Sequence, residues 1–163
     1  MGYSDIKRDP YTWHTTNLGD AGAPGQIFKG VDNVFGGEAH FRLVKHVNAV
    51  TVISGHCASW VAVPAASVIC TVTNDVTGGA DGNSLAIAAG AYVCVPAQGE
   101  YCFIQTWGYH ATLRGDGGIT LADALMYKAA DGQFDTWAGA LPQAGEAWAT
   151  ESASVFPGML RLA

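Results

Sequence analysis

The clearest pattern of apolar and polar positions lies in residues 91–113, where two apolar runs flank the turn-forming segment Pro96-Ala97-Gln98-Gly99. Both runs are rich in Val, Tyr, Phe, Ile and Trp, which predicts a β-hairpin. With residue 98 at the apex, the facing pairs are Tyr92 with Ile104 and Cys94 with Cys102, while Val93 and Val95 share the other face with Tyr101 and Phe103. Because both faces are apolar, we expect central strands that are packed on two sides in the middle of the core.

Gly108 interrupts the second run, which is typical of a bulge or a bend, and the strand pattern resumes from Tyr109 to Leu113. The further strands expected are residues 26–29, one or more within 39–54, 60–63, 68–73, 84–89, 134–137, 148–155 and 159–162, the last two on either side of Pro157-Gly158. Residues 120–128 fit a helical turn or a strand, and residues 74–83, 114–118 and 143–146 are predicted as loops or turns. Turn signals recurring roughly every 8–12 residues predict an all-β fold, either a compact β-sandwich or a small β-barrel.

The first 25 residues show no periodicity and end in a Gly-rich segment. They nevertheless contain large apolar side chains, which leaves two arrangements open. One is an extended N-terminal arm that becomes ordered only against a partner; the other is a segment folded back on its own domain. We expect residues 1–25 to form an extended N-terminal arm and residues 26–163 a single β domain. The candidate partner-interface residues are Tyr3, Tyr11, Trp13, Ile27 and Phe28.

Composition narrows the possible partners. The chain is 49% hydrophobic over 163 residues, enough for one sizeable core, and only 13% charged, against roughly 25% in ordinary soluble domains. Fewer charges leave more of the surface suited to being covered by a partner. A net charge of −6 without any basic run argues against nucleic-acid or anionic-membrane binding. No stretch approaches the ~20 apolar residues of a membrane span.

The cysteines point to a reducing compartment. The N-terminus has no apolar signal segment, and the four cysteines form no C-x-x-C pair. We therefore expect reduced, buried thiols in a protein made in the cytoplasm, with a Cys94–Cys102 bridge as the alternative.

Catalytic chemistry is not favoured by the sequence. His56 and Cys57 place an imidazole beside a thiol, but adjacent strand residues point to opposite faces, so a buried structural thiol is the better interpretation of Cys57. Arg114-Gly115-Asp116 matches a cell-adhesion tripeptide, yet it is ordinary turn chemistry. An enzyme would require His56 or His110 to lie beside Cys57 or a carboxylate in a cleft.

Metal binding is likewise not expected. Glu38 and His40 share a strand face, but the further histidines His46, His56 and His110 could join them only through tertiary contacts. The loop with Asp75, Asp81 and Asn83 has oxygen ligands but lacks calcium-loop spacing and a terminal bidentate Glu. We expect no catalytic residue, no cofactor and no metal site.

Aromatic surface is the feature that remains. Five tryptophans cannot all be buried in a small β domain without a partner for each indole N–H: Trp13, Trp60, Trp107, Trp137 and Trp148. Such side chains stack on sugars in lectins and act as anchors in protein interfaces. The low charge content favours an interface.

Several segments are similar to the small decoration, or cement, proteins on the heads of tailed bacteriophages. The similar segments are Phe41-Arg-Leu-Val-Lys-His-Val-Asn-Ala, Ala88-Ala-Gly-Ala-Tyr, Gly99-Glu-Tyr-Cys-Phe-Ile-Gln-Thr-Trp-Gly-Tyr-His-Ala with the pattern G-x-Y-x-x-[VI]-Q-x-x-G, Asp131-Gly132-Gln-Phe-Asp, and Gly145-Glu-Ala-Trp-Ala-Thr-Glu. The resemblance covers residues 26–162. It implies a β-rich, non-enzymatic virion structural protein, commonly a trimer, that sits at local three-fold or two-fold positions and clamps major capsid subunits.

The expected function is therefore binding to the outside of a phage capsid, after synthesis in the host cytoplasm, so as to stabilise contacts between major capsid subunits. The expected partners are the major capsid protein and further copies of the chain, as a trimer or a dimer. The alternative is a β-sandwich carbohydrate-binding or receptor-binding module of a virion head or fibre, which a shallow aromatic groove lined by Asn, Asp and Gln would support.

Overall fold

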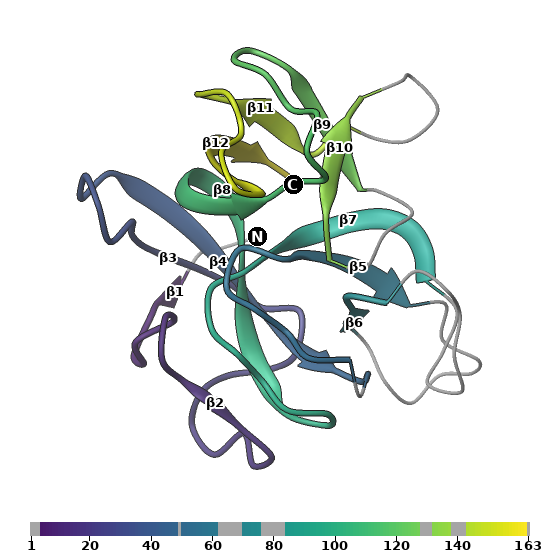
Figure 1. Cartoon of the computed structure of the whole chain (residues 1–163). Coiled ribbons are helices and arrows are strands. Elements are labelled where there is room, and N and C mark those ends of the chain that lie inside the picture. Colours follow the sequence, from purple (N-terminus) through teal and green to yellow (C-terminus); the bar gives the residue numbers. More distant parts are fainter. Residues whose placement is uncertain are drawn as a thin grey trace.

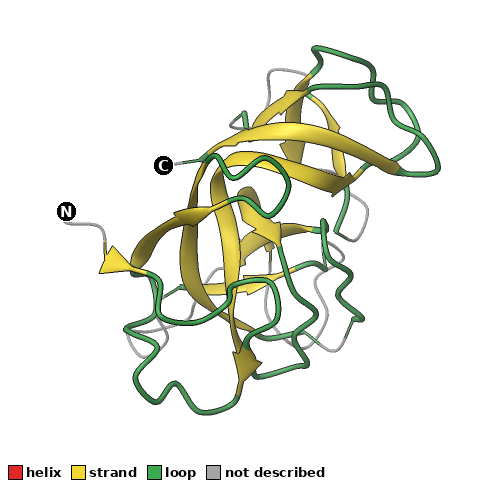
Figure 2. Ribbon diagram, turned by 90° about the vertical axis from the view of Figure 1, so that its left-hand side faces the viewer, coloured by secondary structure: helices red, strands yellow, loops and turns green. Residues whose placement is uncertain are grey.

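A computed structural model describes residues 4–48, 50–61, 70–75, 84–127, 132–137 and 143–162. Over these residues the protein is all-β, as predicted, with 12 strands joined in one mixed sheet and no helix (Figures 1 and 2). The strands are β1 (Ser4–Asp5), β2 (His14–Thr15), β3 (Ile27–Val31), β4 (Glu38–His46), β5 (Cys57–Val61), β6 (Thr71–Thr73), β7 (Ser84–Tyr92), β8 (Tyr101–Arg114), β9 (Ala124–Tyr127), β10 (Phe134–Thr136), β11 (Gly145–Ala147) and β12 (Val155–Arg161). No helix in this part of the chain could span a membrane.

Five strands close into a small barrel. In the order β4, β6, β5, β7 and β8, each strand pairs with the next, and β8 pairs back with β4. Four of these pairings are antiparallel, whereas β4 and β6 run parallel. An odd number of strands cannot alternate in direction all the way round a closed ring, so one parallel neighbour is required.

The 14-residue strand β8 extends the sheet beyond the barrel. Its first half pairs with β4 and β7, and its second half pairs with β12, which is followed by β11, β9 and β10. Figure 1 shows these later strands above the barrel. At the other edge, β3 pairs with β4 and β1 pairs with β3.

Three apolar clusters form the core of the protein. The barrel interior is filled by side chains that include Val44, Tyr92, Cys94, Cys102 and Ile104. A second cluster lies between the barrel wall and the later strands, around Leu113, Leu125, Phe134, Phe156 and Leu160. The third lies outside β4 and β8, around Phe28, Phe41, Leu43 and Phe103.

The central hairpin has the predicted register, with Tyr92 opposite Ile104. Cys94 and Cys102 are buried in one cluster as free thiols, so the alternative of a bridge is not the arrangement found. The irregularity expected near Gly108 is present as a register shift in the β4–β8 pairing just before it, and Gly108 itself has φ +99°. A Cβ at this position would meet the Glu38 carbonyl oxygen at 2.7 Å, so only glycine fits the crossing of the two strands.

The C-terminal predictions need correction. Residues 145–147 form β11 rather than a turn, and residues 124–127 of the ambiguous stretch form the strand β9. One strand, β12, runs straight through Pro157-Gly158, while residues 148–154 belong to none of the strands. A register shift between Phe156 and Gly158 accommodates Pro157, which has no N–H to donate to the ladder. The predicted strand residues 62–63 and 68–69 and the loop residues 76–83 lie outside the described residues.

The N-terminal segment is folded back on its own domain. Within residues 4–25, β1 pairs with β3, and β2 pairs with β8 through His14 opposite Cys102. Tyr11 packs on Phe41 and Trp13 packs on Phe103, with ring centroids 5.7 and 5.3 Å apart. Of the two arrangements left open by the sequence, the structure has the one in which this segment covers the third apolar cluster.

Candidate interaction surface

The predicted interface residues lie mainly against the domain itself. Tyr3 lies outside the described residues, and Tyr11, Trp13 and Ile27 are half-buried. Phe28 is only 4% exposed and packs edge-on against Phe103, so it is a core residue with no surface left for a partner. It faces inward because it pairs with Phe41 across β3 and β4, on the side that the N-terminal segment covers.

The exposed aromatic side chains lie elsewhere. Trp107, Trp137 and Trp148 are 39%, 43% and 46% exposed, whereas Trp13 and Trp60 are half-buried. Three of the five tryptophans are therefore available to a partner, and they lie in the second half of the chain.

Strand register places these residues on one side of the sheet. Across β8, β12, β11 and β9, the paired residues are Tyr109, Met159, Glu146 and Ala124. Trp137 donates its backbone N–H to the Ala124 carbonyl (2.6 Å), which continues this row into the residue after β10. The alternating residues Leu125, Ala147 and Leu160 are buried in the core on the opposite side, so the row faces solvent. We call Trp107, Tyr109, Trp137, Trp148 and Met159 the aromatic face.

A second row of paired residues crosses the sheet two positions along β8 from Tyr109. It consists of Lys29 on β3, His40 on β4, Trp107 on β8 and Arg161 on β12. The Trp107 ring stacks on His40 (centroids 5.0 Å, 27° between planes), and Trp148 lies 5.5 Å from Tyr109. Because the rings of Trp107, Tyr109 and Trp148 each rest on a neighbouring ring, these three side chains are held in fixed positions instead of projecting separately into water.

Gln105 fixes the backbone behind these rings. The register shift before Gly108 interrupts the regular ladder, and the buried Gln105 side-chain amide donates to the carbonyls of Trp107 (3.3 Å) and Tyr109 (2.8 Å). The Thr106 hydroxyl donates to the His40 carbonyl at 3.4 Å. Buried polar groups thus position the backbone of Trp107 and Tyr109 on β8.

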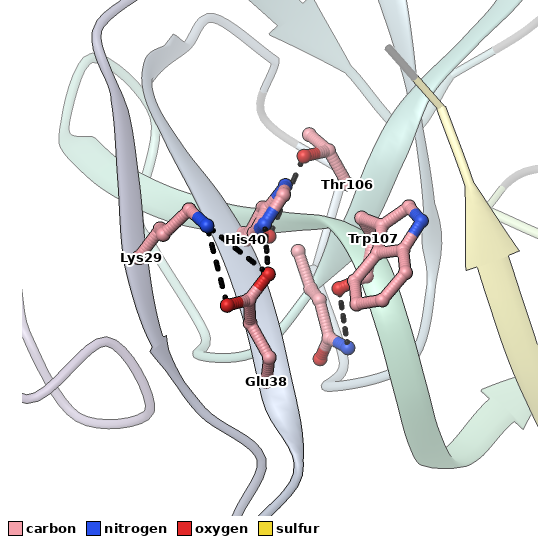
Figure 3. Close-up of polar contacts among 6 residues, drawn as sticks. Lys29, Glu38, His40, Thr106 and Trp107 are labelled. Carbon is pink, nitrogen blue, oxygen red and sulfur yellow. Dashed lines mark hydrogen bonds and ion pairs between the residues drawn. The ribbon is translucent and has the colours of Figure 1, made fainter. Parts of the chain in front are cut away.

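Charges around the aromatic face are compensated in pairs. Figure 3 shows the Glu38 carboxylate between Lys29 and His40, with Trp107 beside them; the distances are 3.2 Å to Lys29 Nζ and 3.0 Å to His40 Nε2. Hydrogen bonding from His40, followed by that from Lys29, lowers the pKa of Glu38 below its usual value. At the other end of the row, Arg161 pairs with Glu146 at 3.2 Å. The charges of Lys29, Glu38, Arg161 and Glu146 therefore sum to zero, although the whole chain has a net charge of −6.

The turn between β3 and β4 presents a further apolar group beside this face. Phe35 is 71% exposed, and its ring lies 4.7 Å from that of Tyr109; Val31 and Val34 are exposed next to it. The buried Asp32 carboxylate accepts hydrogen bonds from the backbone N–H groups of Val34 (3.0 Å), Phe35 (2.7 Å) and Gly37 (2.6 Å). We call Val31, Val34 and Phe35 the hairpin tip.

Hydrogen bonding also sets the charge state of Asp32. Burial acts to raise the pKa of its carboxyl group, but the bonds from Phe35, Val34 and Gly37 outweigh burial and hold the pKa below its usual value. The ionised carboxylate therefore orders the turn that carries the exposed Phe35.

The residues weighed for catalysis are not arranged for it. Cys57 is fully buried, and desolvation raises the pKa of its thiol well above the usual value, the opposite of what a nucleophile requires. Burial lowers the pKa of His110 to about 4, and its Nδ1 accepts the Thr112 N–H at 3.2 Å. His110 lines a pocket of about 250 Å³ with Tyr11, Asn33, Val34, Ser54, Gln105, Ala111 and Thr112, none of which is a carboxylate.

Metal ligands are not assembled in the part of the chain that the structure describes, where no group of three candidate side chains is found. Glu38 and His40 do meet, but with Lys29 as the third group. His46 lies in the barrel, 2.9 Å from the Tyr92 hydroxyl. Asp81 and Asn83 of the proposed oxygen-rich loop lie outside the described residues.

Comparison with known proteins adds no relative. No protein-family model, no curated protein and no solved structure matches the chain. The functional argument therefore depends on the geometry of the aromatic face.

Sequence reasoning named the three exposed tryptophans as part of a set but gave the N-terminal residues the interface role. It did not single out Phe35. The signal that could have found the tip is Asp32 followed by Gly36-Gly37, which is typical of an ordered side-chain-capped turn, with an aromatic residue inside it.

Proposed function

We propose that the protein is a non-enzymatic virion structural protein that binds the outside of a phage capsid and stabilises contacts between major capsid subunits. The observation that carries the proposal is the aromatic face, where three tryptophans, a tyrosine and a methionine share one solvent-facing side of the sheet. Exposed apolar surface of this kind marks a place where another molecule binds.

The composition of the aromatic face favours a protein partner. Trp, Tyr, Met and Arg are the residues enriched at protein interfaces, and Trp, Tyr and Arg contribute most of the measured hot spots. The charged side chains at its ends are already paired within the chain, so docking does not strand an isolated charge. A sugar-binding groove would instead be lined by Asn, Asp and Gln, and the pocket that contains Asn33 and Gln105 lies outside the aromatic face.

The exposed area indicates how such binding must work. At about 250 Å² per tryptophan side chain, exposed fractions of 39%, 43% and 46% leave roughly 300 Å² of tryptophan surface. A stable interface buries about 800 Å² on each partner. The face therefore needs its neighbouring residues, or several linked copies acting together, to bind stably to a repetitive shell.

The test is cosedimentation of the purified protein with empty capsid shells from the same source. Wild-type protein should bind saturably at a fixed stoichiometry per capsid subunit. The double variant Trp137→Ala/Trp148→Ala should bind at least tenfold more weakly, while Ile53→Ala, an exposed apolar residue on the loop before β5, should bind like wild type. Thermal melts establish that all three proteins are folded.

Absence of wild-type binding at high concentration removes the proposal. A glycan array then tests the carbohydrate-binding alternative with the same variants. Equal capsid affinity of the double variant and wild type would instead mean that a different surface is used.

A further inference from the structure

The pocket that contains His110 lies where four separate segments of the chain meet, and we call it the polar pocket. Its volume is about 250 Å³. Its lining includes Tyr11 from the N-terminal segment, Asn33 from the turn between β3 and β4, Ser54 from the loop before β5, and Gln105 and His110 from β8. No residue of the aromatic face lines this pocket, so it is a separate feature of the surface.

Gln105 brings to the polar pocket a hydrogen-bond acceptor that the fold does not use. The residue is only 1% exposed, and its side-chain amide donates to the carbonyls of Trp107 (3.3 Å) and Tyr109 (2.8 Å). These two carbonyls fix the orientation of the amide, so the nitrogen faces them and the oxygen Oε1 is left over. No residue in the described part of the chain donates to Oε1. Because a buried acceptor without a donor is unfavourable, this oxygen favours a bound molecule that supplies an N–H or O–H group.

Two further polar side chains of the lining are available to a ligand. Those of Asn33 and Ser54 form no hydrogen bond with any residue that the structure describes. Their backbones are nevertheless fixed. The Asn33 N–H donates to the Tyr11 hydroxyl (3.2 Å), and the residue after Ser54 is Gly55, where a Cβ would meet the Thr112 carbonyl oxygen at 1.7 Å. The loop before β5 therefore lies directly against β8, and an amide and a hydroxyl are held in place beside the pocket.

The lining of the polar pocket is uncharged near neutral pH. It contains no Asp, Glu, Lys or Arg. Burial lowers the pKa of His110 to about 4 and raises the pKa of Tyr11 to about 12, so both side chains are neutral there. The His110 ring is moreover bonded to its surroundings, since Nδ1 accepts the Thr112 N–H at 3.2 Å. An ion entering the pocket would lose its hydration without meeting an opposite charge, so the lining favours an uncharged ligand.

The size and the walls of the polar pocket define the ligand further. A cavity of roughly 150 Å³ accommodates benzene, so about 250 Å³ has room for one six-membered ring with its substituents. Tyr11, Val34 and Ala111 supply apolar wall. A purely apolar ring would leave the Gln105 oxygen without a donor, whereas hydroxyl groups both donate and accept. A neutral pyranose combines one ring, no charge, apolar ring faces and several hydroxyl groups.

We propose that the polar pocket binds a single neutral pyranose residue, whose hydroxyl groups donate to Gln105 Oε1 and bond with the side chains of Asn33 and Ser54. Unlike the shallow aromatic groove expected of a sugar-binding module, this site uses no tryptophan. It gives the chain a glycan-binding activity in addition to the protein contact proposed for the aromatic face.

The test is a titration of the isotope-labelled protein with the methyl pyranosides of glucose, galactose, mannose and N-acetylglucosamine, followed by amide NMR spectra. At least one of these sugars should bind saturably, with a dissociation constant in the millimolar range, and shift the amide signals of Asn33, Ser54 and Thr112. The corresponding uronic acid, which adds a carboxylate, should bind at least tenfold more weakly. The measurement uses the protein without capsid, so its outcome does not depend on the capsid proposal.

Variants locate the site. Asn33→Ala/Ser54→Ala removes two of the polar groups and should weaken binding of the same sugar at least tenfold. Ala111→Phe places a ring in the pocket and should abolish binding. Ser152→Ala removes an exposed hydroxyl in the turn before β12 and should bind like wild type. The dispersion of the amide spectra shows whether each variant is folded.

Three results would overturn the proposal. They are the absence of shifts with every neutral sugar of the panel, equal affinity of Asn33→Ala/Ser54→Ala and wild type, and shifts confined to Trp107 and Trp148 of the aromatic face. N-methylacetamide, which mimics a peptide group, is titrated in parallel. If it shifts the pocket signals and no sugar does, the pocket binds a peptide and the proposal is wrong.

Discussion

Replacing Asp32 with alanine removes the group that orders the turn between β3 and β4. Its carboxylate accepts hydrogen bonds at 2.6–3.0 Å from the backbone N–H groups of Val34, Phe35 and Gly37, in the turn that carries the exposed Phe35 ring. The backbone bond from Asp32 N–H to the Gly37 carbonyl (2.8 Å) does not involve the side chain and should survive the substitution.

The loss of stability follows from these hydrogen bonds. Hydrogen bonds to a charged group contribute about 1.5–3 kcal/mol each, but Val34 and Phe35 are exposed, so water takes over part of what the carboxylate supplied. A side chain that caps comparable N–H groups at a helix start is worth ~0.5–2 kcal/mol. Because the substitution leaves all three N–H groups without this acceptor, we expect Asp32→Ala to lower the free energy of unfolding by about 2–3 kcal/mol. At roughly 2–4 °C per kcal/mol for a domain of this size, the melting temperature should fall by about 4–12 °C.

The assay is urea unfolding followed by tryptophan fluorescence, with Asp32→Asn as the matched control that keeps one acceptor oxygen and should lose less. Because the pKa of Asp32 is lowered on folding, its contribution is fully present above the usual value of 3.8 and is lost as pH falls through the lower folded-state value. The difference between wild type and Asp32→Ala should therefore stay constant from pH 7 to pH 5 and shrink below about pH 4. A difference below ~0.5 kcal/mol, or one that is unchanged at pH 2, would refute the role assigned to this carboxylate.

Three further predictions concern the sheet. Gly108→Ala should lower the free energy of unfolding by at least about 2 kcal/mol, because φ is positive there and the added Cβ would meet the Glu38 carbonyl oxygen. Gly117→Ala, which also has a positive φ but open space around it, should lose about half as much stability in the same urea titration. Gln105→Met should destabilise by about 1–3 kcal/mol and shift the tryptophan emission to the red, since two carbonyls behind Trp107 and Tyr109 lose their donor; an unchanged emission spectrum would mean that other contacts hold these rings. Deleting residues 1–25 should expose Phe41 and Phe103 and increase binding of a hydrophobic dye, whereas a deletion variant as stable as wild type would show that this segment is dispensable for the fold.

Local patterns predicted local structure well. The register of the central hairpin followed from the turn at residues 96–99 and the apolar runs beside it, because a short connection leaves few alternative pairings. Closure of the barrel could not be obtained in this way. It depends on pairings such as Lys45 with Thr71 between the parallel strands β4 and β6. Such pairings join segments that are far apart in the chain, and the apolar pattern of neither segment indicates which other segment it pairs with.

The N-terminal segment shows why composition alone could not assign the interface. Tyr11 and Trp13 are large aromatic side chains like Trp137 and Trp148, so residue type does not distinguish the two pairs. What separates them is whether an unfilled apolar surface lies within reach in the fold. Phe41 and Phe103 offer such a surface to the first pair, and that proximity is a property of tertiary structure.

The apolar character of both faces of β8 has two different causes along its length. His40 and Arg42 stand two residues apart on β4 and so share a face, and their partners Trp107 and Ile104 therefore share the corresponding face of β8. At Ile104 this face is enclosed by the other strands of the barrel, and Arg42 lies over the Trp60 ring, 5.4 Å from its centroid, at the end of that enclosed region. At Trp107 the same face of β8 is exposed to solvent, but it still carries a large apolar side chain. A strand that only had to close the barrel could be polar from this point onward, and the aromatic continuation of β8 is the surface that the proposed capsid contact would cover.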